Sequence, residues 1–131
     1  MSYEANEFEV ASVSALAGRE RFDYFLRKVT DWEEVWSIGN DQGWALSADA
    51  SGQEVVPVWP ARAFAEACCV AQWAGYAPKA IELHTWNDKW IPGMNTDSRH
   101  VAVFPTPADR GVVVTPDELA GAINGALEEY E

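Results

Sequence analysis

Cysteine and histidine are scarce in this chain, with two of each among 131 residues. The cysteines are the neighbours Cys68 and Cys69, whose side chains point about 100° apart on a helix, so a bond between them would be strained. The absence of a disulfide framework favours a reducing compartment and predicts a cytoplasmic protein. His84 and His100 lack cysteine or histidine partners at zinc-ligand spacing. We therefore expect no metal site and no cofactor.

Basic residues are also few, since 9 Lys and Arg face 21 Asp and Glu and give a formal net charge of −12. Phosphate backbones and anionic lipids need clustered Lys and Arg, so this balance argues against nucleic acid and membrane surfaces as partners. No apolar run approaches the roughly 20 residues of a membrane-spanning helix. The first residues lack the basic and apolar regions of a secretory signal. A protein partner remains compatible with the acidic surface.

The chain nevertheless has enough apolar material for a core, because 48% of its residues are hydrophobic and seven are tryptophan. Its length is that of one ordinary domain. The polar and acidic residues 1–11 predict a loose, flexible acidic arm. Residues 12–131 predict a single α/β domain.

Hydrophobic periodicity and turn residues divide the first half of this domain. Phe22, Phe25, Leu26 and Val29 follow helical spacing, which predicts a helix from Ser14, as its cap, to about Thr30. Three short strands at 35–38, 44–47 and 54–58 are separated by close turns and predict an antiparallel meander. Pro60 then suits the first position of an apolar helix over residues 61–74.

The second half begins with a short strand over residues 80–84. Thr85 and Asp88 are spaced as a capping box of a short helix that Pro92-Gly93 would end. Strands at 99–104 and 111–114 follow, and Pro116 opens the last helix. The predicted fold class is α/β (α+β), one domain in which a mostly antiparallel or mixed sheet of about five short strands packs with roughly three to four helices.

Motifs that carry chemistry are missing from the pattern. The two cysteines lie inside an alanine-rich apolar helix, where burial makes a thiol inert. The segment 39–43 is bounded by glycines but is acidic and lacks the lysine of a phosphate-binding loop. No serine occupies a Gly-x-Ser-x-Gly turn. We predict no catalytic residue and favour a protein that is not an enzyme.

Several tryptophans and prolines follow one another in an order that resembles a known family. The first half reads Arg21-Phe22-x-Tyr24-Phe25, Glu34-Val35-Trp36, Gly43-Trp44 and Pro57-Val58-Trp59-Pro60. The second half reads Trp86 to Trp90-Ile91-Pro92-Gly93, Asp97, Val101-Ala102-Val103-Phe104-Pro105 and Val114-x-Pro116-x-x-Leu119. Over residues 14–127 the chain resembles the small bacterial family called domain of unknown function 2750. That family has no assigned activity, so the resemblance implies no catalytic residues. The layout is also distantly similar to the N-terminal domain of SseB-like proteins, which is an analogy of fold alone.

Two hypotheses about function follow. The first is a non-enzymatic interaction module, acting as an adaptor, a regulatory subunit or an immunity-type protein, with a protein partner or a second copy bound through Trp59, Trp86 and Trp90 as anchors. The second is a small-molecule-binding protein or enzyme with a pocket between the Trp86–Trp90 helix and the strand that begins at Arg99. The polar residues nominated for that pocket are His84, Asp97, Arg99 and His100.

Overall fold

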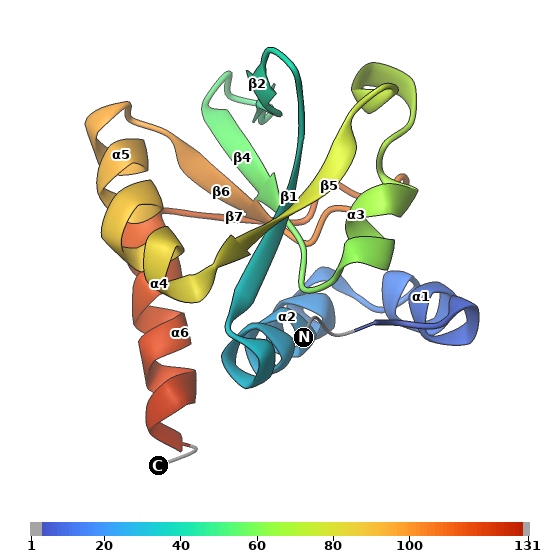
Figure 1. Cartoon of the computed structure of the whole chain (residues 1–131), viewed down its shortest axis with the longest axis horizontal. Helices are drawn as coiled ribbons and strands as arrows, with labels where there is room; N and C mark the ends of the chain where they lie inside the picture. The colour runs from blue at the N-terminus through green and yellow to red at the C-terminus, as the bar shows by residue number, and fades with distance from the viewer. Residues whose placement is uncertain (1–3, 130–131) are drawn as a thin grey trace.

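The computed structural model describes residues 4–129 of the chain (Figure 1). The helical elements are α1 (Glu7–Ser14), α2 (Gly18–Trp32), α3 (Arg62–Ala67), η1 (Ala71–Trp73), α4 (Leu83–Thr85), η2 (Trp86–Trp90), α5 (Ile91–Thr96) and α6 (Pro116–Glu129). The strands are β1 (Glu34–Asn40), β2 (Gly43–Trp44), β3 (Ser47–Ala48), β4 (Glu54–Val58), β5 (Ala77–Glu82), β6 (His100–Val103) and β7 (Val112–Val114). The predicted fold class, one mixed α/β domain, is confirmed.

The strands form two sheets where the sequence analysis expected one. Within residues 4–129, one sheet has the order β2-β1-β5 and the other has the order β3-β4-β6-β7, in which β4 and β6 are parallel and the remaining pairs are antiparallel. The two sheets meet where Trp36 and Trp59 exchange two backbone hydrogen bonds of 2.9 and 2.8 Å. Backbone hydrogen bonds therefore join the two sheets at this point.

The predicted three-stranded meander is wrong. β1 pairs with β2 over two residues only, and the chain then leaves this sheet so that β3 pairs with β4 in the other one. The second neighbour of β1 is β5, which pairs with it from Glu34↔Glu82 to Gly39↔Ala77. Few residues of β5 are large and apolar, and β5 lies some 40 residues after β1 along the chain. The turn residues next to β1 therefore gave no indication of this pairing.

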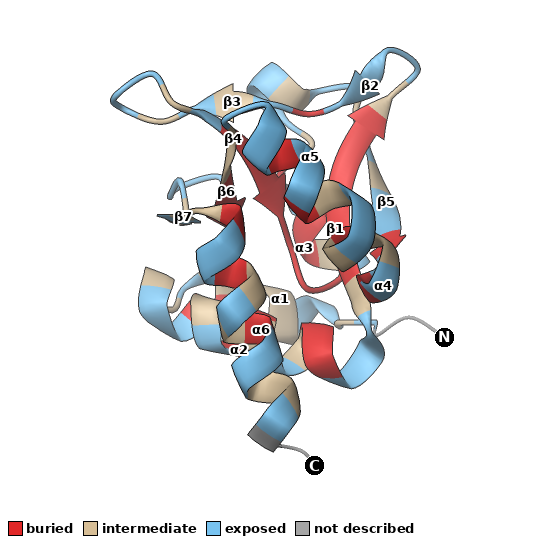
Figure 2. Cartoon of the chain, turned by 90° about the vertical axis from the view of Figure 1, so that its left-hand side faces the viewer, coloured by how far each residue is buried: buried red, intermediate tan, exposed pale blue. Residues whose placement is uncertain are grey.

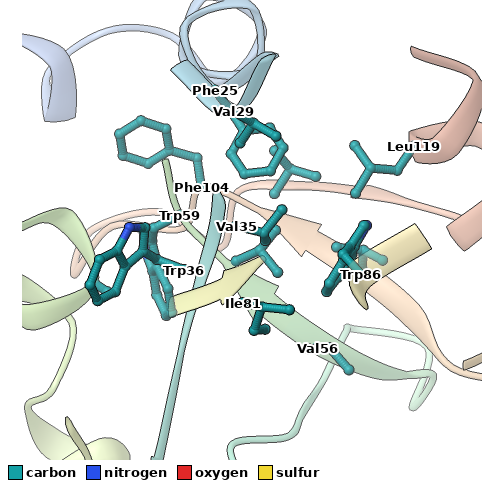
Figure 3. Packing of buried hydrophobic residues seen from close by; sticks show 14 of the residues in the cluster. Phe25, Val29, Val35, Trp36, Val56, Trp59, Ile81, Trp86, Phe104 and Leu119 are labelled. Carbon is teal, nitrogen blue, oxygen red and sulfur yellow. The ribbon is translucent and has the colours of Figure 1, made fainter. Parts of the chain in front are cut away.

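The core lies between the sheets and the two long helices. α2 contributes Phe25 and Val29 and α6 contributes Leu119, all of them fully buried (Figure 3). β1 and β4 are the most deeply buried strands, whereas the helices are buried only on their inner faces (Figure 2). This arrangement follows from the spacing of three and four residues between the apolar positions of α2.

The N-terminal segment differs from its prediction. α1 occupies residues 7–14, where Asn6 caps the helix by accepting a hydrogen bond from the backbone of Glu9 at 2.9 Å. The expected loose arm over residues 1–11 is thus helical from Glu7 onward, and residues 1–3 lie outside the described part of the chain. Ser14 ends α1 instead of capping the next helix, which begins at Gly18.

Two further helices depart from the sequence prediction. α3 ends at Ala67, short of the expected residue 74, because Val70 is extended and Ala71 adopts a left-handed φ of 52°. Ala61 occupies the N-cap position, so Pro60 lies outside the helix. These deviations place Trp73 on a short turn instead of on a continuous helix.

The segment of residues 83–96 is one helical stretch made of α4, η2 and α5. Thr85 has helical backbone angles and makes no capping bond, so the predicted capping box does not form; Asp88 instead pairs with His84 at 3.0 Å. Pro92 lies in the first turn of α5 and does not end the helix. The π-helical turn η2 ends at Trp90, two residues before this proline. Proline has no N–H and cannot donate a helical hydrogen bond.

Candidate functional site

A surface hollow of about 480 Å³ lies between the turn that carries β2 and the helical stretch of residues 83–96. We call it the aromatic hollow. Its lining residues are Gln42, Gly43, Trp44, Leu46, Val56, Lys89, Trp90, Gly93, Met94, Asp97 and Arg99. Figure 1 shows these segments in the upper part of the molecule, with β2 at the top, α5 at the upper left and β4 between them.

The aromatic wall of the hollow is a row of three indoles. Trp44 meets Trp90 edge-on with ring centroids 4.6 Å apart, and Trp90 stacks on Trp86 at 5.5 Å. Trp86 is fully buried and Trp44 is 41% exposed, so the row runs from the core to solvent. Leu46, 38% exposed, extends the apolar surface beyond Trp44. Edge-on and stacked contacts of this kind hold large rings in fixed orientations.

The rim of the hollow is basic in an otherwise acidic protein. Lys89 and Arg99 line the hollow, and Lys79 places its Nζ 5.6 Å from the ring centroid of Trp44. Three of the nine basic residues of the chain therefore surround this one site. Arg99 is engaged by Asp97 at 3.3 Å and by Glu54 at 3.5 Å. Among the described residues, neither Lys79 nor Lys89 forms an ion pair, and the Lys79 ammonium lies against the Trp44 ring.

The three tryptophans predicted as anchors differ in their exposure to solvent. Trp90 lines the hollow as expected of an anchor, but Trp59 and Trp86 are fully buried. The indole of Trp59 donates a 2.8 Å hydrogen bond to the carbonyl of Pro105, so it is fixed in the core. Neither Trp59 nor Trp86 can serve as an exposed anchor, and their place in the sequence analysis is corrected to packing.

The four polar residues predicted for a pocket are divided as well. Asp97 and Arg99 line the aromatic hollow, close to where the second hypothesis located a pocket. His84 projects into solvent beside Asp88 and lines no part of the hollow. His100 opens β6, is half-buried and lines no part of the hollow. The four side chains do not converge.

Sequence reasoning missed Trp44, Leu46 and Met94 as lining residues. The exposure of Trp44 could have been expected from the sequence. Trp44 directly follows the turn at Gly43 on a strand of two residues, and so short a strand is not covered by other elements. Met94 gave no signal, since the sequence analysis ended the helix at Pro92-Gly93.

A second hollow of about 430 Å³ lies over the outer face of the β3-β4-β6-β7 sheet. Its floor includes Val55 and Ala102, and its wall includes Trp73 and the loop that carries Asp109 and Arg110. The carboxylate of Asp109 is held by the buried Arg21 at 2.7 Å. Asp109 is thus engaged within its own chain, whereas Arg110, which also lines this second hollow, forms no ion pair with a described residue.

The cysteines have the character of packing residues. Burial raises the pKa of the Cys68 thiol to about 11, and burial also raises the pKa of Cys69. The Cys68 thiol donates to the carbonyl of Pro105 at 3.3 Å. A thiol with a raised pKa is a poor nucleophile near neutral pH. No group of three or more His, Cys, Asp or Glu able to hold a metal ion occurs among the described residues.

Fold and site together define a small mixed α/β domain that carries a hollow lined by Trp44 and Trp90 and flanked by Lys79, Lys89 and Arg99. A family model described as "Protein of unknown function (DUF2750)" matches residues 22–123, and the chain belongs to this family. No curated protein and no solved structure matches the chain. The layout analogy to SseB-like domains stays a prediction. Across the described residues, none of the helices has the length and apolar character needed to cross a bilayer.

Proposed function

We propose that this protein is a protein-interaction module that binds its partner through the aromatic hollow. The observation that carries the proposal is the exposed Trp44 and Leu46 beside the partly buried Trp90, a cluster of large apolar groups that faces solvent. Tryptophan, methionine and arginine are the residues most enriched in the centres of protein interfaces, and this hollow contains all three. The role fits a bacterial adaptor, regulatory subunit or immunity-type protein that works in the cytoplasm.

The rigidity of the hollow also supports protein binding. Trp90 is stacked on the buried Trp86 and Trp44 is packed edge-on against Trp90, so the anchors are ordered before a partner arrives. Binding then costs less conformational entropy than it would for mobile side chains. A rigid aromatic wall beside two unpaired lysines offers both apolar contact and charge selection.

Replacing Trp44 by Ala tests the proposal, because Trp44 is exposed and its loss leaves the core intact. We expect W44A to melt close to the wild-type temperature and to lose at least tenfold in affinity for the partner, consistent with removal of an interface anchor. The measurement is photo-crosslinking from position 46 in host lysate, followed by a binding titration with the captured protein. W32A is the matched control, since Trp32 on α2 is 39% exposed and lies outside the hollow. Equal capture by W44A and W32A would refute the proposal.

A small-molecule ligand is the second candidate, and the size of the hollow favours it. Its volume of about 480 Å³ falls within the range of about 300–1,000 Å³ of known ligand sites. Native mass spectrometry of the protein purified from its host separates the two candidates. A bound mass of a few hundred daltons that is lost in W44A would support a ligand, whereas a second polypeptide would support the interaction module.

A further inference from the structure

Helix α1 carries the most exposed large apolar side chain of the described residues. Phe8 is 86% exposed, and it is preceded by the acidic Glu7. The next acid, Glu9, is held against its own chain because it accepts a hydrogen bond from the Tyr24 hydroxyl at 2.5 Å. Glu4 and Glu7 are exposed at the start of this segment. The first turn of α1 therefore presents a phenyl ring flanked by carboxylates.

The aromatic hollow has the complementary chemistry. Its apolar surface is formed by Trp44 and Leu46, and its unpaired charges are those of Lys89 and Lys79. Two copies with a formal charge of −12 repel each other at long range, so contact between them is favourable only where the local sign is reversed. The rim carries Lys79, Lys89 and an Arg99 that is paired with carboxylates, so its two lysines supply the positive charge that Glu7 matches, and Phe8 matches its apolar surface.

We propose that a second copy of this chain docks the first turn of its α1 in the aromatic hollow, with Phe8 against Trp44 and Glu7 beside Lys89. The proposal rests on the proposed function, because it takes the hollow to be a protein-binding site and names the partner. Phe8 cannot fill the hollow of its own chain, since α1 lies in the lower half of the molecule and β2 at its top in two perpendicular views (Figures 1 and 2).

The separation of the two surfaces sets the symmetry of the contact. Each copy offers α1 and the hollow on separate parts of its surface, so the contact is head-to-tail and uses two different patches. Such a contact leaves a free α1 and a free hollow on every dimer, to which further copies can add. One helical turn buries less surface than a standard interface, so the association is weak and concentration-dependent.

Complementary variants test the head-to-tail contact. F8A removes the inserted ring and W44A removes its receiving surface, so each variant alone is expected to stay monomeric in sedimentation velocity at protein concentrations up to about 1 mM. Mixed in equal amounts, the two variants are expected to form a one-to-one dimer and nothing larger, because only one intact contact can be made. The wild-type chain is expected to form dimers and longer species as concentration rises.

K89E keeps the test valid if W44A proves unfolded, because Lys89 is an exposed charge on the rim. We expect K89E to reduce association about tenfold and W32A, the matched tryptophan control, to leave it unchanged. A wild-type chain that is monomeric at these concentrations, or one whose association survives both F8A and W44A, would overturn the inference. A monomeric wild type that still captures another protein through Trp44 would leave the proposed function standing while removing this one.

Discussion

Phe104 occupies a backbone conformation that phenylalanine rarely adopts, with a φ of 56°. Its carbonyl accepts a 3.1 Å hydrogen bond from Nε of the buried Arg21, and its amide donates to the carbonyl of Val58 at 2.8 Å. The next carbonyl, that of Pro105, accepts from Trp59 and from Cys68. Left-handed backbone in a bulky residue is costly and persists only where its surroundings fix it. Arg21 on α2, Trp59 directly after β4 and Cys68 directly after α3 thus hold the end of β6 in place.

Gly111 packs against this fixed segment, and its substitution is our first stability prediction. Gly111 has a φ of 81°, and a Cβ there would lie 2.5 Å from the carbonyl oxygen of Val103. G111A should therefore lower the free energy of unfolding by at least about 2 kcal/mol, measured by urea unfolding.

Gly121, in the middle of α6, provides the opposite control. Nothing lies within 4 Å of a Cβ built there, so G121A should stabilise the protein by about 0.5–1 kcal/mol through helix propensity. The two glycines differ in backbone angle and in the space around a Cβ, and both differences are visible only in the structure. Equal effects of G111A and G121A would contradict the strained geometry at Gly111.

Asp109 carries the pH-dependent part of the same network. The hydrogen bond from Arg21 is the main cause that holds the pKa of Asp109 below its usual 3.8. As the pH falls, the unfolded chain therefore binds this proton first. The contribution of the pair is complete above the unfolded-state pKa and is lost as the pH falls through the lower pKa of the folded state.

We expect D109N to lower the free energy of unfolding by about 1 kcal/mol near neutral pH, a modest value because Asp109 is half exposed. The deficit should shrink as the pH falls below about 4. Urea unfolding of both proteins across this range measures it. D41N, in the exposed turn between β1 and β2, should track the wild type at every pH. A deficit that stays constant down to the lowest pH would show that the charge of Asp109 contributes nothing.

At the scale of elements, sequence motifs predicted features that depend on contacts between neighbouring residues, such as the start of the last helix. The last helix was correctly expected to open at Pro116, and the structure adds a reciprocal capping box between Thr115 and Glu118, with bonds of 2.9 and 3.1 Å. The capping box that was predicted at Thr85 is wrong, because Thr85 lies within a helical stretch and has no helix start to cap. The prediction of strand pairing failed for a related reason. The parallel partners β4 and β6 are brought together by packing, and the residues between them in the sequence do not indicate that pairing.

The candidate site shows the same division. Trp90, Asp97 and Arg99 were predicted near a pocket because they lie close together in sequence on one helix and the following strand. Trp44 and Leu46 reach the hollow only through the fold, which carries the β2 turn over to the helical stretch. Composition could not tell the exposed Trp44 from the buried Trp59 and Trp86, because tryptophan serves both cores and interfaces.

At the scale of the whole molecule, the two sheets share one core. Trp59 lies at the junction, bonded through its backbone to Trp36 of the first sheet and through its indole to Pro105 beyond the second. The buried cluster continues across both sheets and into α2 and α6. Because neither sheet buries its apolar face alone, they should unfold as one unit despite their limited hydrogen bonding to each other.

Guanidinium unfolding followed by two probes tests this unity. Tryptophan fluorescence and far-ultraviolet circular dichroism should give coincident transitions in the wild type. W59F removes the indole bond to Pro105 and part of the junction, so it should cost about 2 kcal/mol and shift both transitions equally, without separating them. The control D41N, in the exposed turn between β1 and β2, should move neither by more than about 0.5 kcal/mol. Two midpoints in the wild type would mean that the sheets are separate folding units, and a split that arises only in W59F would mean that Trp59 alone couples them.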